Sequence, residues 1–173
     1  MRKANKVVLI VATSQQAGKS TGAHFVAGML DAPYISTSRI ISERVEDRLG
    51  LARGSIPAIR AHDAEAYRDE LINEGNHMDD LGKPPGVVAL ERGYRVIEGI
   101  RRTNELVQTV AYAQHMYGLR PLVVCIERPG GPPLNDNTQA AGLRQHADEL
   151  ILNDGDFESL RLKIKEVLER HDF

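Results

Sequence analysis

The residues Gly18-Lys19-Ser20-Thr21 have the types and spacing that most directly suggest chemistry in this 173-residue chain. They follow the aliphatic run "KVVLIVA", which is typical of a strand buried on both faces, and they open a segment with helical spacing of apolar residues. A loop at such a junction points backbone N–H groups and a helix N-terminus at an anion, while the lysine contacts phosphate and the hydroxyl contacts Mg²⁺. The sequence therefore predicts a phosphate-binding loop over residues 12–21.

One residue of this loop departs from the usual G-x-x-x-x-G-K-[ST] pattern, because Thr13 stands at the first glycine. A β-branched residue is strained there if the turn demands a positive φ, and unstrained at an ordinary φ. The alternative is an ordinary strand-to-helix turn with an exposed lysine, but the flanking strand and helix favour the phosphate loop. Lys19 is then expected at the β- and γ-phosphates, Ser20 at the metal and Thr21 near the α-phosphate. The other expected nucleotide contacts in the loop are Ser14, Gln15, Gln16, Ala17 and Gly18.

A second polar cluster lies in "RVIEGIRRTNEL", just after another strand-like run. In open α/β sheets ligands bind beyond the carboxyl ends of the strands, so Glu98, Arg101 and Arg102 are expected near the loop. A carboxylate there can hold the Mg²⁺ shell, and arginines stabilise transferring phosphoryl charge or bind an acceptor's phosphate. Alternatively, Arg101 and Arg102 are surface residues without a functional role, and the charge of Glu105 on the next helix balances theirs. Glu98 competes with Glu127, which also ends a strand, and spacing alone does not choose between them.

Strand-like and helix-like segments alternate along the chain, which predicts an α/β fold of three layers, with a mainly parallel five-stranded sheet and helices on both faces. Strands are expected at 6–12 and in "PYIST", "YRVIEGI", "PLVVCIE" and "ELILN". Helices are expected at 18–30 and in "SRIISERVEDRL" and "TNELVQTVAYAQHMYG". The segment "AEAYRDELINEGNHMDDLGKPP" is expected to start as a helix and to fray toward Gly75 and Gly82. Asp156 is expected to cap a closing helix whose buried stripe is formed by Leu160, Ile164, Val167 and Leu168. Residues 128–139 are rich in turn formers and are expected to form a mobile surface loop.

Composition and charge limit the class of protein. A chain of 173 residues with 42% hydrophobic residues can bury one core, so one domain is expected. The net charge of −2 provides no broad basic field, so nucleic acid could be held only by a local patch. The chain shows no signal-peptide pattern and no apolar run near the roughly 20 residues that span a bilayer, which favours a cytoplasmic protein without a membrane partner. The single cysteine, Cys125, is expected to be a buried structural thiol, and the six histidines lack metal-ligand spacing.

Three segments together resemble a known family. The loop "SQQAGKST", the segment "VIEGIRRTNEL" and the C-terminal run "VVCIERPG…ADELILNDGDFESLRLKIKEVL" are similar to phage-type deoxynucleoside monophosphate kinases, within the wider group of P-loop nucleoside and nucleotide kinases. The resemblance implies a P-loop NTPase kinase fold in a single domain over residues 1–173. It also implies transfer of the γ-phosphoryl group of ATP to a deoxynucleotide, with Mg²⁺ as cofactor, in the host cytoplasm if the chain is phage-encoded.

The same resemblance implies roles for individual residues. It favours Glu98 over Glu127 as the acid near the metal, because in that group the strand of the phosphate loop neighbours the strand that carries this acid. Arg128 stands where relatives place a phosphate-facing arginine, beside a lid-like loop at about 128–146. The residues expected near the adenine of the donor are Asn153, Asp154 and Gly155. The expected catalytic set is Lys19, Glu98, Arg101 and Arg128, with the two arginines neutralising transition-state charge.

The acceptor is expected to bind in a helical region at about 36–92, where kinases of this group build the cover of the acceptor site. The acceptor-binding candidates are Ser36, Ser38, Arg39, Arg68, Arg101 and Arg102. Asp63 and Glu70 are candidate bases if the acceptor is a hydroxyl, which must lose a proton, whereas a phosphate acceptor needs no strong base.

Three functions stay open on the sequence alone. The leading one is phosphorylation of a free deoxynucleoside monophosphate. The segment "YISTSRIISERVEDRL…YRDELINEGNHMDDLG" is also similar to small phage kinases that act on 5-hydroxymethyluracil within DNA, in base hypermodification, so DNA is the second candidate partner. The third is a nucleotide-binding module without turnover. It stays open because Thr13 departs from the usual loop pattern and because spacing does not choose between the two candidate acids. The helix expected at 103–117 fits a homodimer interface and packing on the sheet equally well.

Overall fold

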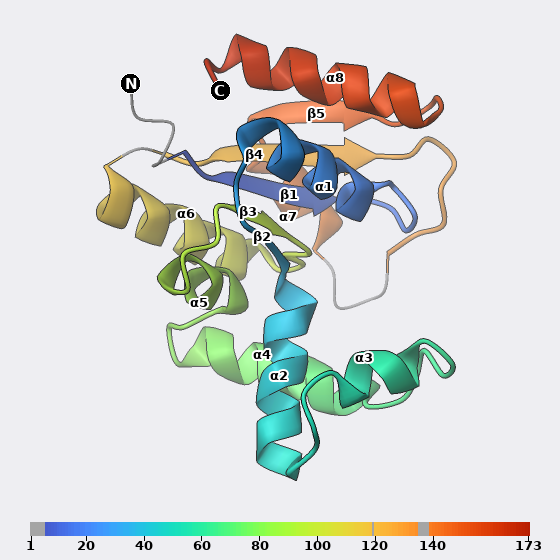
Figure 1. The fold of residues 1–173 in the computed structure, drawn as a ribbon, viewed down its shortest axis with the longest axis vertical. Helices are drawn as coiled ribbons and strands as arrows, with labels where there is room; N and C mark the ends of the chain where they lie inside the picture. The colour runs from blue at the N-terminus through green and yellow to red at the C-terminus, as the bar shows by residue number, and fades with distance from the viewer. Residues whose placement is uncertain (1–5, 119, 135–138) are drawn as a thin grey trace.

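A parallel sheet forms the centre of the molecule (Figure 1). The computed structural model describes residues 6–118, 120–134 and 139–173. Within those ranges the sheet has five strands in the order β2-β3-β1-β4-β5, and every neighbouring pair is parallel. The strands are β1 (Val8–Ala12), β2 (Tyr34–Ser36), β3 (Val96–Glu98), β4 (Leu122–Glu127) and β5 (Glu149–Leu152). The α/β class and the five-stranded parallel sheet expected from the sequence are confirmed.

Helices connect the strands and close the chain. They are α1 (Lys19–Leu30), α2 (Thr37–Leu49), α3 (Ser55–Arg60), α4 (Arg68–Asp80), α5 (Pro85–Glu91), α6 (Thr103–Tyr117), α7 (Ala140–Gln145) and α8 (Phe157–Arg170). None of the helices in the described part of the chain combines the length and the apolar character that crossing a membrane requires.

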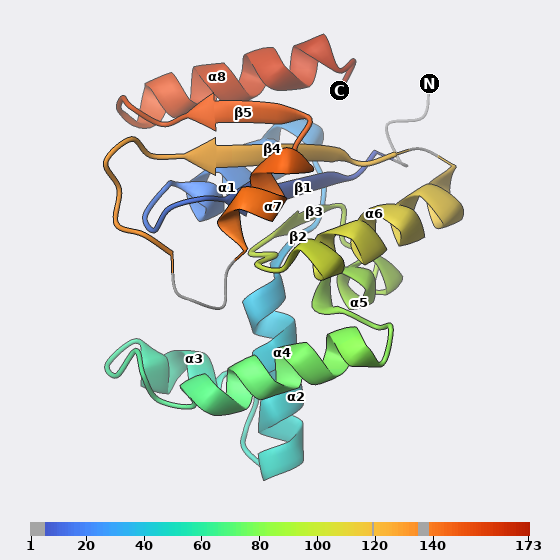
Figure 2. The same cartoon turned by 180° about the vertical axis from the view of Figure 1, so that it is seen from behind.

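The two faces of the sheet carry separate apolar clusters because side chains alternate along each strand. On one face Val8 and Ile10 of β1 pack with α1 and α8, and on the other Leu9 and Val11 pack with α2, α5, α6 and α7. Figure 1 shows α1 and α8 on the near side of the sheet, and Figure 2, seen from behind, shows α6 and α7 on the opposite side. All five residues of β1 are buried, as expected of a central strand covered on both faces.

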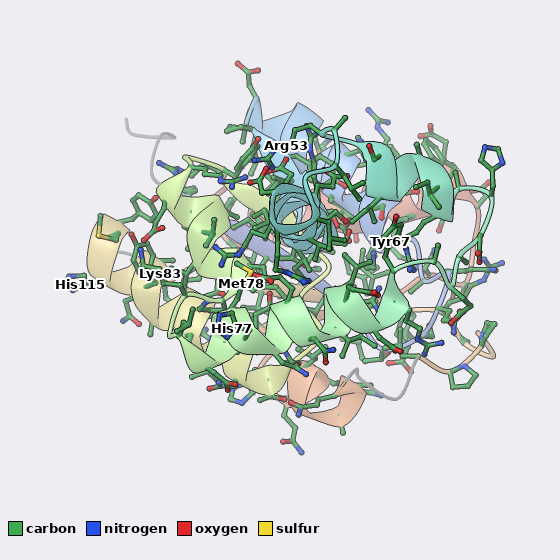
Figure 3. All side chains as sticks on the ribbon, turned by 90° about the horizontal axis from the view of Figure 1, so that it is seen from below. Arg53, Tyr67, His77, Met78, Lys83 and His115 are labelled. Atoms are coloured by element: carbon green, nitrogen blue, oxygen red, sulfur yellow. The ribbon has the colours of Figure 1, made fainter. Side chains whose placement is uncertain are left out.

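The helices α2, α3 and α4 form a layer that projects from the β2 side of the sheet (Figure 1). Figure 3 looks at this layer along α2, with α4 crossing it and the labelled Met78 on the side of α4 that faces α2. Met78 is 1% exposed and belongs to the same apolar cluster as Ile40 of α2, so the layer is anchored to the core of the sheet.

Local signals in the sequence located most elements correctly. Gly50 and Gly118 end α2 and α6, and the Asp156 carboxylate accepts the Ser159 N–H at 2.9 Å at the start of α8. The predicted stripe of α8 is buried at all four positions, Leu160, Ile164, Val167 and Leu168.

Three short helices were not predicted, and one of them corrects the lid-like loop expected at about 128–146. Residues 140–145 form α7, in which Leu143 is fully buried against the sheet cluster. The Gln139 side chain just before α7 accepts the Thr103 N–H at 2.8 Å, which ties this segment to α6. The end of the expected loop is therefore a packed helix and not a loop; residues 135–138 lie outside the described residues.

Candidate functional site

The predicted phosphate loop connects the buried strand β1 to the first turn of α1. Gly18 adopts φ 89 and Gln16 adopts φ 53, whereas Thr13 has no positive φ, so its β-branched side chain is unstrained. Only glycine fits at position 18, because a Cβ there would also lie 2.7 Å from Asn153 Nδ2. The Asn153 amide in turn donates to the Ala17 carbonyl at 2.9 Å. The loop is thus held in its curved path from behind by the turn that follows β5.

Four side chains meet where the loop passes the end of β3. The Lys19 ammonium lies 2.6 Å from Glu98 Oε2, and the Ser20 hydroxyl donates to Glu98 Oε1 at 3.3 Å. The Tyr34 hydroxyl donates to the same Oε1 atom at 3.3 Å. Burial and the negative charge of Glu98 raise the pKa of Tyr34 to about 12, so this phenol remains a donor at neutral pH. Glu98 is 2% exposed, and its charge is balanced by Lys19 within the cluster.

The strand register explains why Glu98 and not Glu127 lies in this cluster. Glu98 is paired with Ile10 of β1 on one side and with Ser36 of β2 on the other, which brings it beside the first turn of α1. Glu127 lies on the other side of β1 and is 3.1 Å from the guanidinium of Arg144 in α7.

A cavity of about 490 Å³ opens in front of the loop, and we call it the loop cavity. It is lined by Ala12, Ser14, Gln15, Gln16, Ala17, Gly18, Lys19, Ser20, Thr21, Gly99, Ile100, Arg101 and Leu134. Its volume lies within the range of about 300–1,000 Å³ that is usual for ligand sites. All eight loop residues that the sequence predicted as nucleotide contacts line it.

A second cavity of about 210 Å³, the helical cavity, lies between the loop and the helical layer. It is lined by Thr37, Ser38, Ile41, Ser42, Pro57, Arg60, Glu65, Arg68, Leu71, Ile72, Gly99, Arg101, Arg102 and Glu105. Gly99 and Arg101 line both cavities, so the two are neighbours across one short loop.

Gly99 allows β3 and α2 to approach closely at the boundary of the cavities. Its φ is 91, and a Cβ there would lie 3.0 Å from the Thr37 hydroxyl and 3.2 Å from the Ser36 hydroxyl. A side chain at this position would be strained and would push α2 away from the end of β3. The glycine thus brings the start of α2 against the loop that carries Arg101.

Arg101 is exposed over part of its side chain, but its guanidinium is partly withdrawn from water. Loss of hydration lowers its pKa, the negative charge of Glu98 opposes this, and the nearby Arg60 lowers it further. An arginine stays protonated at neutral pH regardless, so the junction of the two cavities carries a fixed positive charge.

Arg102 was predicted as an acceptor contact, but protein groups occupy its guanidinium. It donates to both oxygens of Asp79, to the Gly75 carbonyl at 3.1 Å and to Glu105 Oε2 at 3.3 Å. Such a bidentate pair within a partly buried network holds α4 against α6. Arg102 forms part of the cavity wall, and Arg101 has the more open position of the two.

The other predicted acceptor residues divide into two groups. Ser38 and Arg68 line the helical cavity, and Arg68 also pairs with Glu65 at 2.7 Å. Ser36 lines neither cavity, but its hydroxyl is 2.9 Å from that of Ser38. Arg39 lines neither cavity; it is exposed and lies 3.3 Å from Glu43 one helical turn away, so its position does not support the acceptor prediction.

The residues predicted by resemblance around the nucleotide base lie at the rear of the loop. Asn153 supports the loop as described, and Asp154 pairs with Lys163 at 2.5 Å on the surface. Gly155 packs against Ser159, where an added Cβ would lie 2.8 Å from that side chain. Arg128 contacts the loop through its backbone N–H, which donates to the Ser14 hydroxyl at 3.1 Å. Their roles toward a ligand stay predictions.

The sequence interpretation missed several lining residues of the helical cavity, among them Arg60, Ser42 and Thr37. Arg60 ends α3, a helix of six residues without a side-chain cap, so no periodic signal marked it. Glu105 was considered only as a surface partner of the arginines, yet it is 2% exposed. Burial raises the pKa of Glu105 to about 7, and the neighbouring Arg102 lowers it less than burial raises it.

The chain matches no protein-family model and no curated protein. Solved structures that align with most of this chain include a provisionally assigned kinase from Chloroflexus aurantiacus, at 14% identity over 96% of this chain and 98% of that one, with a TM-score of 0.49. They also include shikimate kinase from Aquifex aeolicus, at 17% identity over 96% and 98% of the chains, with a TM-score of 0.47. Shikimate kinase from Acinetobacter baumannii in complex with shikimate has 14% identity over 97% and 94% and a TM-score of 0.46. At these identities and TM-scores, the matches specify neither an activity nor an acceptor for this chain.

The oxygen groups around Glu98 fit a magnesium ion. Mg²⁺ prefers oxygen ligands and is usually held by one or two protein groups together with substrate phosphates and water. The Ser20 hydroxyl and the Glu98 carboxylate are 3.3 Å apart at the mouth of the loop, so one ion could contact both. No group of three or more His, Cys, Asp or Glu side chains suited to a metal occurs in the part of the chain that the structure covers. An ion held by Ser20 and Glu98 would take its other ligands from phosphate oxygens and water, as is usual for Mg²⁺.

Tyr34→Phe is expected to weaken divalent-metal binding by about tenfold, because partners that orient a metal-binding carboxylate typically contribute 10–100-fold to affinity. The variant removes the hydrogen bond to Glu98 Oε1 and keeps the ring, which packs 4.6 Å from the His24 ring. Binding of Mn²⁺ in the presence of a nucleoside triphosphate, followed by electron paramagnetic resonance, measures the effect. Tyr112→Phe on α6 is the matched control, and equal affinity for both variants would show that Tyr34 does not position Glu98.

Proposed function

We propose that this chain is an ATP-dependent P-loop kinase that transfers the γ-phosphoryl group to a deoxynucleoside monophosphate. The observation that carries the proposal is that the loop cavity and the helical cavity meet at Gly99 and Arg101. A kinase must hold a donor and an acceptor in line, and phosphoryl transfer depends mainly on such positioning and on charge stabilisation.

The loop cavity supplies the groups that a triphosphate donor needs. The loop N–H groups and the start of α1 favour phosphate, and Lys19 places an ammonium among them. Ser20 and Glu98 are the residues that would hold Mg²⁺, which when bound neutralises charge on the phosphates. Lys19 is paired with Glu98 at 2.6 Å in this structure, so it must turn toward the phosphates when a donor binds.

The helical cavity combines the two features of a nucleotide acceptor. Arg60, Arg68 and Arg101 provide positive charge suited to a phosphate monoester, because guanidinium groups bind phosphate in a bidentate manner. Its apolar wall, suited to the face of a base, is formed by Ile41, Pro57, Leu71 and Ile72. A volume of about 210 Å³ suits one small molecule or one base turned out of a helix, and does not accommodate stacked duplex.

The proposal is tested by incubating the protein with γ-labelled ATP, Mg²⁺ and two acceptors in separate reactions. One contains dAMP, dCMP, dGMP and dTMP, and the other contains duplex DNA with 5-hydroxymethyluracil. We expect label in soluble deoxynucleoside diphosphates and a mild salt dependence. Label in precipitable DNA, falling steeply as salt rises, would instead establish the DNA kinase. Label in neither acceptor would contradict the proposed function and favour a binding module.

A further inference from the structure

The wall of the helical cavity contains a carboxyl group with an unused oxygen. Glu105 lies in the first turn of α6 and is 2% exposed. Its Oε2 accepts an N–H of Arg102 at 3.3 Å, whereas its Oε1 has no hydrogen-bond partner among the described residues. A buried acceptor atom without a partner costs free energy, and such atoms are few in native proteins. A ligand in the cavity that this residue lines could supply the missing donor.

The protein groups around Glu105 do not supply that donor. Hydrogen bonding of the Glu105 carboxylate with the backbone N–H groups of Arg101 and Gly86 lowers its pKa, but among the described residues no donor meets Oε1 in good hydrogen-bond geometry. Arg102 is directed mainly at Asp79 of α4, whose charge raises the pKa of Glu105. The α5 helix contributes the Gly86 N–H to this environment. The other charged residues that line the same cavity are Arg60, Glu65, Arg68 and Arg101, and the charges of Arg101 and Glu105 interact.

We propose that Glu105 Oε1 accepts a hydrogen bond from an N–H or O–H group of the acceptor. Glu105 then selects acceptors that carry a neutral donor group in addition to the phosphate that Arg60 and Arg101 attract. The inference rests on the proposed function, since it assigns the acceptor to the helical cavity. The donor group is either a base N–H or a sugar O–H, which offer the same chemistry to a carboxylate.

The protonation state of Glu105 gives this recognition a pH dependence. Because burial raises its pKa to about 7, Glu105 is mostly ionised at pH 8 and mostly protonated at pH 6. The proton would reside on Oε1, because Oε2 faces an N–H of Arg102. Protonation thus changes Oε1 from an acceptor into a donor. The KM for the acceptor is therefore expected to rise by about tenfold from pH 8 to pH 6, in proportion to the loss of the competent form.

The test compares the wild-type protein with Glu105→Gln, using the deoxynucleotide that receives label. Arg102 orients the amide oxygen toward itself, so the amide NH₂ occupies the place of Oε1 and mimics the protonated acid. At pH 8 we expect the acceptor KM to rise by about tenfold or more, as for loss of a hydrogen bond to a charged group, with kcat and the KM for ATP within about threefold. The matched control is Glu91→Gln on α5, which lines neither cavity.

Folding and substrate titration are controlled separately. Glu105→Gln should melt no lower than wild type at pH 8, because a carboxyl with a raised folded pKa destabilises the ionised protein. The substrate phosphate titrates near pH 6 with both proteins. The ratio of the acceptor KM of the variant to that of wild type therefore reports the contribution of Glu105 alone. This ratio should approach one at pH 6, because Glu105 is then mostly protonated in the wild type. Two analogues of dTMP, one methylated at N3 and one lacking the 3′ hydroxyl, identify the hydrogen-bond donor group of the acceptor. With the analogue that lacks this group, Glu105→Gln should not raise the acceptor KM any further.

The outcomes separate the inference from the proposed function. An acceptor KM unchanged by Glu105→Gln, with label transfer intact, would refute the role of Glu105 and leave the kinase standing. A fall in melting temperature and in kcat without a change in acceptor KM would show a structural role only. If the wild-type protein labels no acceptor, the proposed function fails, and the inference fails with it.

Discussion

Replacement of Lys19 by alanine is expected to lower kcat by about a hundredfold to a thousandfold. The Lys19 ammonium lies in the loop cavity beside Ser20, where a donor's β- and γ-phosphates are proposed to bind. Removing one preorganised charge from the position of a developing transition-state charge typically costs about 2.7–4 kcal/mol, which corresponds to this range of rates. Single-turnover rates with γ-labelled ATP measure the loss at the chemical step.

The Lys19 variants need a control for folding, because Lys19 also balances the buried Glu98 carboxylate. Lys19→Gln keeps a hydrogen-bond donor for Glu98 and removes only the charge, so it should fold and remain as inactive as the alanine variant. Lys165→Ala, on the exposed face of α8, should retain full activity. Activity of Lys19→Gln within threefold of wild type would show that the loop does not act on a transferring phosphoryl group.

The loop could be predicted from the sequence because its determinants are contiguous. A buried strand, a glycine before a lysine and a following helix are all visible within residues 6–30. The choice between Glu98 and Glu127 is different, since β3 and β4 flank β1 on opposite sides and both carboxylates end a strand. Only the pairing of the strands decides that Glu98 meets Lys19 while Glu127 meets Arg144. Strand order is a long-range property that spacing along the chain does not contain.

The acceptor side was less predictable because it is assembled from short helices. Arg39 and Arg68 both lie in the first turn of a helix, but the phase of α2 directs Arg39 to Glu43 while Arg68 lines the helical cavity. Arg60 ends a helix of six residues, and Glu105 has the charge pattern of a surface residue. What buries Glu105 is the packing of α4 and α5 against α6, which no local pattern indicates.

Replacement of Arg101 by alanine is expected to lower kcat by about a thousandfold, with a smaller effect on the KM of either substrate. Arg101 lines both cavities, so its guanidinium lies between the proposed positions of donor and acceptor. An arginine that stabilises a transferring phosphoryl group contributes about 10³–10⁵ to turnover. We place the expected loss at the lower end of that range because part of the Arg101 side chain is exposed to water.

The split between kcat and KM decides what Arg101 does. Loss of kcat at saturating substrates assigns it to the transition state, whereas a rise in acceptor KM alone makes it a binding group. Arg101→Lys keeps the charge but loses the bidentate geometry, so it should restore part of the rate if charge matters and little of it if geometry dominates. Arg161→Ala, an exposed arginine on α8 paired with Glu158, is the control. Full activity of Arg101→Ala would contradict the proposal that the reaction takes place where the two cavities meet, even if ATP still binds the loop.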